Sequence, residues 1–167
     1  MNKFEKVSFE EFKKSMGTII SPENLTYAYN ELKLPKRATK GSAGYDFKSP
    51  FDFVLAPGMT IKIPTGIKCS LNENRALFML PRSSFGFKYQ IQLDNTIGLI
   101  DQDYYNNENN EGHIFVKMTN HSNSEYLRVK QGDSFVQGII VAYDITDDDE
   151  ATETRTGGIG STNNKGG

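Results

Sequence analysis

The sequence predicts an all-β domain that is preceded by one or two short helices and followed by a flexible tail. From Lys36 onward, short runs rich in Val, Ile, Phe and Tyr are interrupted by Gly, Pro and Asn about every ten residues, which is typical of short antiparallel strands. No helical pattern alternates with these runs, so a sandwich, a barrel or a jelly roll is favoured over a parallel α/β sheet. The length of 167 residues suits one domain with a buried core.

The helices are expected before Pro35. In SFEEFKKSM, Ser8 is placed as an N-cap with Glu11 three residues later, which is the capping-box arrangement. In SPENLTYAYNELKL, Ser21 is the expected cap and Pro22 takes the first helical position, ahead of Leu and Tyr residues at helical spacing.

The strands follow in order, with APGMT and VKQGDS as turns between them. The expected strands are residues 44–47, 59–64, 67–70, 76–80, 90–93, 97–100, 113–119, 126–129 and 135–143. After Tyr143 the chain is polar and poor in apolar residues, so a mobile tail is expected there. The sequence thus predicts three parts: a helical extension over residues 1–33, a β domain over 34–144 and a tail over 145–167.

Composition excludes several classes of function. The formal net charge of −2 argues against non-specific attraction to nucleic acid or to a membrane surface. Cys69 is the single cysteine, so neither an intrachain disulfide nor a cysteine-based zinc cluster is available. His113 and His121, the two histidines, are badly spaced for a metal pair. Because we find no signal-peptide pattern and no long apolar run, we expect a soluble protein of the reducing cytoplasm.

Several polar residues stand where chemistry is possible, although each has an ordinary alternative. Asp46 in AGYDF fits a strand-end acid that accepts from a nearby amide. Arg82, Ser83 and Ser84 follow an expected strand, where Arg, hydroxyls and free amides can cradle a phosphate or simply form a turn. Gln137 in an apolar strand fits a core amide whose partners are backbone groups.

Two further features are as ambiguous when taken alone. Asp101, at the end of the strand TIGLI, fits either a hairpin acid or a general base that activates water for phosphate-ester hydrolysis. The tail RTGGIGSTN combines Arg155 with glycines and hydroxyls, but a lone glycine cluster is weak evidence for a site.

In series, these segments resemble the five motifs of the homotrimeric dUTPase family. The match comprises residues 43–47, 81–86, 95–104, 132–138 and 155–162, in the family's order and with similar spacers. It includes LPKRATKGSAGYDF, LPRSSFGFK, NTIGLIDQDY and GGIGST. The resemblance implies a jelly-roll-like distorted barrel that assembles as a homotrimer. It also implies Mg²⁺-dependent hydrolysis of dUTP to dUMP and pyrophosphate, at sites built from all three subunits.

The same resemblance implies roles for individual residues on the nucleoside side. Asp101 matches the general base that directs water at the α-phosphorus. Asn95 matches a residue that reads uracil, together with backbone groups of the surrounding strand pair, including those of Leu99 and Ile100. Tyr104 matches the aromatic ring beneath the deoxyribose, which leaves no room for a 2′-hydroxyl.

On the phosphate side, the resemblance assigns Arg82, Ser83 and Ser84 to the phosphate-binding turn and Gln137 to a nearby amide. Asp46 matches an acid that meets Mg²⁺ through water. In the tail, Arg155 matches the clamp on the γ-phosphate, and Gly158 and Ile159 lie in the segment that closes over the nucleotide.

This chain departs from the family pattern in four places. Ile159 stands where a phenylalanine usually stacks on uracil; Phe85, Phe87 and Phe115 are candidate substitutes. Only Thr156 separates Arg155 from the glycine pair, which is one residue fewer than in many members. An insertion, YNNENNE, follows Tyr104 at the expected mouth of the site. The first thirty or so residues are additional to the family core, and either pack on its outside or bind a partner.

Two alternatives remain beside an active dUTP hydrolase. One is a regulator with the same fold that binds nucleotide and uses its extra segments to grip a protein. The other is the related dCTP deaminase, which needs a carboxylate over the cytosine ring. We find no acid for that role in place of the GLIDQDY segment.

Overall fold

The computed structural model describes residues 1–153, 155 and 157. Within this part of the chain there are twelve strands and three α-helices. The helices are α1 (Phe9–Met16), α2 (Pro22–Glu31), α3 (Ser83–Tyr89) and the short 3-10 helix η1 (Gln102–Tyr104). The strands are β1 (Lys3–Lys6), β2 (Lys36–Arg37), β3 (Tyr45–Lys48), β4 (Phe53–Leu55), β5 (Thr60–Pro64), β6 (Ile67–Ser70), β7 (Arg75–Pro81), β8 (Ile91–Leu93), β9 (Gly98–Ile100), β10 (Phe115–Asn120), β11 (Leu127–Val129) and β12 (Ser134–Ala142).

The described strands form four small sheets, and every pairing between them is antiparallel. The largest has the order β2-β3-β12-β7-β9, and the others are β5-β10-β8, β11-β4 and β1-β6. A mainly β fold of short antiparallel strands is therefore confirmed. None of the four described sheets closes on itself, so the described strands do not form a closed barrel.

All nine expected strands have a counterpart, but the sequence did not predict β1, β2 or β4. β1 has one apolar side chain, Phe4, and it is held by pairing with β6, where Phe4 lies opposite Cys69. The sequence pattern at Arg82, Ser83 and Ser84 fitted a phosphate cradle or a plain turn and did not predict a helix, whereas residues Ser83–Tyr89 form α3. The Arg82 carbonyl accepts the amides of Phe85 and Gly86, both at 3.0 Å, and thereby starts α3.

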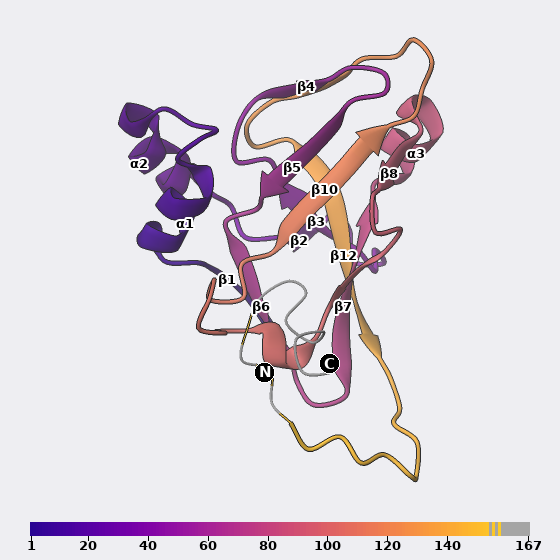
Figure 1. The fold of residues 1–167 in the computed structure, drawn as a ribbon. Coiled ribbons are helices and arrows are strands. Elements are labelled where there is room, and N and C mark those ends of the chain that lie inside the picture. Colours follow the sequence, from indigo (N-terminus) through magenta and orange to yellow (C-terminus); the bar gives the residue numbers. More distant parts are fainter. Residues whose placement is uncertain (154, 156, 158–167) are drawn as a thin grey trace, which may run out of the picture.

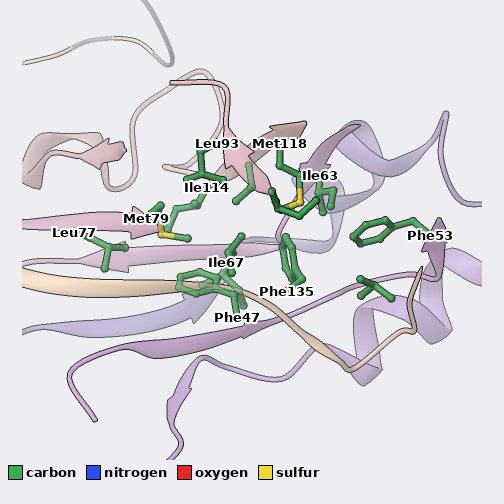
Figure 2. Packing of buried hydrophobic residues seen from close by; sticks show 14 of the residues in the cluster. Phe47, Phe53, Ile63, Ile67, Leu77, Met79, Leu93, Ile114, Met118 and Phe135 are labelled. Carbon is green, nitrogen blue, oxygen red and sulfur yellow. The ribbon is translucent and has the colours of Figure 1, made fainter. Parts of the chain in front are cut away.

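The main core lies between the sheets (Figure 2). Phe47 of β3, Leu77 of β7 and Phe135 of β12 are fully buried there, with Ile63 of β5 and Met118 of β10. Since side chains alternate faces along a strand, the inward positions of five strands meet in one apolar layer. The sheets are therefore held together across their faces as well as by hydrogen bonds.

The N-terminal helices have a second apolar cluster of their own. α1 and α2 lie on one side of the strands, away from α3 (Figure 1). Their buried residues are Val7, Phe12, Met16, Leu25, Ala28 and Leu32. Gly66, between β5 and β6, has φ of +74°, and a Cβ there would lie 2.6 Å from Leu32 Cδ1. Only glycine lets this turn pack so closely against the helices.

Both expected helices are observed, and their starts differ in detail. At α1 the Ser8 hydroxyl accepts the Glu11 amide at 3.1 Å, as an N-cap should. At α2 the Ser21 hydroxyl makes no capping bond to the backbone, although Pro22 occupies the first position as expected.

Two further expectations concern the whole chain. The division into residues 1–33, 34–144 and 145–167 stays a prediction, and part of the expected mobile tail (154, 156 and 158–167) lies outside the described residues. None of the helices in the described part is long and apolar enough to cross a membrane.

Candidate active site

The expected phosphate-side residues line one cavity of about 510 Å³, between the start of α3 and strands β3 and β12. Asp46, Arg82, Ser83, Ser84 and Gln137 all contribute to its wall. Asp46 and Gln137 stand directly opposite each other in the β3–β12 pairing. The structure thus brings together side chains from three separate sequence motifs.

Local contacts fix the polar groups of this cavity. Arg82 Nε lies 3.7 Å from Asp46 Oδ1, and Arg82 Nη1 donates to the Ser134 carbonyl at 3.1 Å. Gln137 Nε2 donates to the Pro81 carbonyl at 3.0 Å. A Cβ on Gly44 would lie 2.3 Å from Gln137 Oε1, so the glycine of AGYDF makes room for that amide. Ser83 and Ser84 are exposed at the first turn of α3, where helix amides lack intrahelical acceptors.

Asn95 lines a different cavity, of about 540 Å³, at the turn between β8 and β9. Gly98 and Phe115 share its wall, so Phe115 is the candidate aromatic substitute that lies beside Asn95. Phe87 is 93% exposed, whereas Phe85 lies beneath the Arg82 guanidinium, 5.7 Å from ring centre to Cζ. Leu99 and Ile100 pair with Phe78 and Leu77 of β7.

Asp101 belongs to neither cavity. It directly follows β9 and precedes η1. Its carboxylate accepts from Arg155 Nη2 at 2.8 Å, and Arg155 Nε lies 3.3 Å from Asp103 Oδ1. The Asp101 side chain is 42% exposed, so water has access to this carboxylate. The Arg155 guanidinium also lies over the Tyr104 ring, 5.7 Å from its centre. The expected base, sugar residue and tail arginine therefore form one cluster.

Tyr104 is 4% exposed, and its hydroxyl is held from two directions. It donates to the His113 carbonyl at 2.8 Å and accepts from Asn110 Nδ2 at 2.8 Å. Burial raises the pKa of the Tyr104 phenol, which therefore stays protonated as a donor. The orientation of the ring is fixed by residues of the segment that follows it.

The asparagine-rich insertion is an ordered loop bonded largely to itself. Asn107 Nδ2 donates to the Tyr104 carbonyl at 2.8 Å, and its Oδ1 accepts the amides of Asn109 and Asn110. Asn side chains suit such turns because they bond to nearby backbone groups. A Cβ on Gly112, which has φ of +79°, would lie 2.6 Å from the Tyr104 carbonyl oxygen. The sequence indicated an insertion here but gave no signal of this packing.

The cluster around Asp101 and the cavity around Arg82 lie at opposite ends of β7. Ile100 pairs with Leu77, so continuing the register places Asp101 beside Ala76, whereas Arg82 follows Pro81 at the far end. The six residues of extended strand from Ala76 to Arg82 therefore separate the position of Asp101 from that of Arg82 by roughly 20 Å. A triphosphate is much shorter than this separation of the two backbone positions.

A Mg²⁺ ion fits the Arg82 cavity only as a partner of a bound ligand. No group of three or more His, Cys, Asp or Glu that could hold a metal is found among the described residues. Asp46 is a single carboxylate in this cavity, and it is paired with Arg82. Because Mg²⁺ keeps several waters and prefers one or two carboxylates plus phosphates, this donor set suits contact through water.

The fold thus combines short antiparallel strands, a polar cavity that contains Arg82, and a separate cluster of Asp101 and Tyr104. The dUTPase family profile matches residues 30–163, and the chain belongs to this family. Gly158 and Ile159 fall in that match but lie outside the described residues.

Named relatives agree with this assignment. The chain is 42% identical over 133 residues to the deoxyuridine 5'-triphosphate nucleotidohydrolase of Lactococcus lactis, covering 78% of this chain and 88% of that protein. It is 39% identical over 139 residues to the Haemophilus influenzae protein of the same name, covering 78% and 87%. The crystal structure of dUTPase from Streptococcus mutans superposes with a TM-score of 0.64 at 35% identity, covering 86% of this chain and 98% of that one.

Proposed function

We propose that the chain hydrolyses dUTP to dUMP and pyrophosphate, which limits uracil in DNA and supplies dUMP. The observation that carries the proposal is the water-accessible Asp101 carboxylate beside Tyr104, in a chain 42% identical to a deoxyuridine 5'-triphosphate nucleotidohydrolase. A protein that only bound nucleotide would have no need of such a base.

In the proposed reaction, Asp101 accepts a proton from a water molecule as the water oxygen attacks the α-phosphorus. The bond between that phosphorus and the oxygen bridging to the β-phosphorus breaks, and pyrophosphate leaves with the bonding electrons. General-base catalysis requires the carboxylate to lie within hydrogen-bond reach of the water. The 42% exposure of the Asp101 side chain supports this role.

Positive charge and hydrogen-bond donors hold the phosphates. We assign Arg82, Ser83, Ser84 and Gln137 to this task, since all four line the same cavity. Hydrolysis of a phosphate chain depends mainly on positioning and on neutralising charge. Arg155 is assigned to the γ-phosphate, which requires it to leave the Asp101 and Asp103 carboxylates when substrate binds.

Base and sugar recognition is assigned to the β9 region. Asn95, with backbone groups of Leu99 and Ile100, reads uracil, and Tyr104 lies beneath the deoxyribose. Gly158 and Ile159 are proposed to close over the nucleotide. The position of Phe115 in the Asn95 cavity supports it as the aromatic contact in place of the usual tail phenylalanine.

Mg²⁺ is the proposed cofactor, and when bound it neutralises charge on the triphosphate. Asp46 would hold it through water. This is consistent with the single carboxylate in that cavity.

Three copies of the chain are proposed to assemble as a homotrimer, in which the strands of each copy form a jelly-roll-like distorted barrel. The roughly 20 Å between Asp101 and Arg82 along β7 supports a site shared between copies. We place the protein in the cytoplasm, where the single thiol would stay reduced. Burial raises the pKa of Cys69 to about 12, which also keeps this thiol unreactive.

The test is incubation of the full chain with dUTP and Mg²⁺, with release of dUMP and pyrophosphate as the readout and with dCTP, dTTP and UTP in parallel. We expect release from dUTP and little from the others. Binding of dUTP without any release would reject the enzyme and favour the regulator. Deamination of dCTP would favour the deaminase.

A further inference from the structure

The N-terminal extension touches the loop that fixes Tyr104. The Ser8 amide donates to Glu111 Oε2 at 2.9 Å, and Lys14 Nζ donates to the Asn109 carbonyl at 3.0 Å. Lys68 of β6 binds the same loop, with its Nζ 2.7 Å from Asn106 Oδ1. The insertion is therefore held between the extension and the β domain.

A buried pair connects helix α1 to the same loop. Glu11 is 6% exposed and His113 is fully buried, and Glu11 Oε1 lies 3.0 Å from His113 Nδ1. The Gly66 amide donates to His113 Nε2 at 2.8 Å, so that nitrogen is an acceptor and the proton is on Nδ1. The imidazole is thus a neutral bridge that donates to Glu11 and accepts from Gly66.

The charge state of the bridge agrees with this geometry. Burial lowers the pKa of His113, and the neighbouring Glu11 and Glu111 carboxylates offset part of that effect. The ring is therefore neutral at physiological pH, as an acceptor at Nε2 requires.

The bridging residue His113 also contacts Tyr104, the residue that we propose lies beneath the deoxyribose. The His113 carbonyl accepts the Tyr104 hydroxyl, and the His113 amide donates to the carbonyl of Asn110, whose side chain donates to the same hydroxyl. One partner of the Tyr104 hydroxyl is therefore the His113 carbonyl, and the other, Asn110, is bonded through its own carbonyl to the His113 amide. The His113 ring is in turn held on one side by Glu11, a residue of the N-terminal extension, and on the other by the Gly66 amide.

We propose that Glu11 and His113 are positioning residues for Tyr104, and that the N-terminal extension thereby sets the discrimination between deoxyribose and ribose triphosphates. This rests on the proposed function, in which the Tyr104 ring excludes a 2′-hydroxyl. A hydroxyl is a small group, so a modest tilt of the ring is enough to admit it. The extension is part of the substrate-selecting machinery, and its docking on the β domain is what orients the ring.

The test measures selectivity on the full chain with Mg²⁺. The probes are the non-hydrolysable α,β-imido forms of dUTP and UTP, with their dissociation constants obtained by calorimetry. In Glu11→Ala we expect the UTP-to-dUTP ratio of dissociation constants to fall about tenfold, by analogy with the loss when a group that orients a metal ligand is removed. Tyr104→Ala removes the ring itself and should therefore give the largest fall in this ratio. Glu11→Gln keeps an acceptor for His113 Nδ1, so its ratio stays near wild type.

Control variants separate positioning from stability. Glu10→Ala removes an exposed acid from the same turn of α1, and Leu25→Ala opens a void in the N-terminal cluster, of which His113 is not a member. We expect Leu25→Ala to lower the melting temperature but to keep the selectivity, and Glu10→Ala to change neither. Amide hydrogen exchange over residues 104–113 should accelerate in Glu11→Ala alone. If Glu11→Ala does not fold, Glu11→Asp, which withdraws the carboxylate by one methylene, should show a smaller fall in the ratio.

Several outcomes overturn the inference. Unchanged selectivity in Glu11→Ala or in a folded Glu11→Asp would do so, as would an equal loss in Leu25→Ala. A wild-type chain that binds both probes equally would also reject it. A wild-type chain that does not hydrolyse dUTP, yet binds the deoxyribose probe selectively through Glu11, rejects the proposed function and keeps the inference.

Discussion

Two inactive variants of this chain should restore each other's activity when they assemble together. Asp101→Asn removes the proposed base and keeps the phosphate cavity, whereas Arg82→Ala removes an arginine of that cavity and keeps the base. Because the two residues lie roughly 20 Å apart along β7, we expect each site to take Asp101 from one copy and Arg82 from a neighbour.

The size of the effect follows from counting subunits. In a trimer with equivalent interfaces, random assembly of equal amounts pairs an intact acid with an intact cavity at about one site in four. The co-refolded mixture should therefore regain about a quarter of the wild-type rate of dUMP release. The assay compares each variant alone with the pair after co-refolding, and mass spectrometry of the intact assembly confirms mixing.

The control replaces Asp101→Asn with the double variant Asp101→Asn/Arg82→Ala. Mixed with Arg82→Ala, it offers no intact cavity on any copy, so no activity should return. If verified mixed trimers of the two single variants also stay inactive, the base and the phosphate cavity act within one chain, and the shared-site reasoning is refuted.

The other predictions concern the base, the loop after Tyr104 and the buried histidine. Asp101→Asn should bind dUTP nearly as well as wild type, while kcat falls roughly 10²–10⁴-fold, the usual range for loss of a general base; normal turnover would contradict the assignment. Gly112→Ala should cost about 1–2 kcal/mol for its left-handed backbone, plus the clash with the Tyr104 carbonyl. Its urea midpoint should therefore drop further than that of Gly58→Ala, which has φ of +74° but open space around it; equal drops would rule out the clash. Burial lowers the pKa of folded His113, so the unfolded chain takes up this proton first, and stability should fall as the pH drops below about 6.5. His113→Gln should flatten the pH dependence of the melting temperature between about pH 7 and pH 5, whereas the exposed His121→Gln should not; parallel curves for wild type and His113→Gln would exclude the effect.

Local patterns predicted local structure well. Alternating apolar residues and turn signals located nine strands, because strand positions that face a core must be apolar whatever lies opposite. The Ser8 N-cap of α1 could also be predicted, because its bond to the Glu11 amide spans only three residues. Strand β1 could not be predicted, because its extended conformation depends on pairing with β6, which begins more than sixty residues later.

The same limit applies to side chains. The capping-box spacing predicts that the Glu11 side chain accepts from the Ser8 amide. In the structure, the Ser8 amide instead donates to Glu111, which lies 103 residues further along the chain, and the Glu11 carboxylate bonds to the buried His113. The spacing of residues in the sequence predicts hydrogen bonds between near neighbours only. It cannot predict a bond between residues far apart in the chain, even when that bond has the better geometry.

For the candidate site, the motifs named the residues but not their grouping. The residues assigned to the phosphates did gather in one cavity, and the acid, the tyrosine and the tail arginine did gather in another place. That the two groups lie at opposite ends of β7 depends on the pairing register, which no short motif encodes.

The bond between Ser8 and Glu111 also sets an order of events when the chain is made. It joins residues 103 positions apart, so helix α1 can pack on α2 early, but its bonds to the asparagine-rich loop cannot form until that loop has left the ribosome. β1 can pair with β6 somewhat sooner, since β6 ends at Ser70. The first segment to be synthesised thus makes some of its contacts last, and a chain interrupted before residue 111 would leave the buried Glu11 carboxylate without His113.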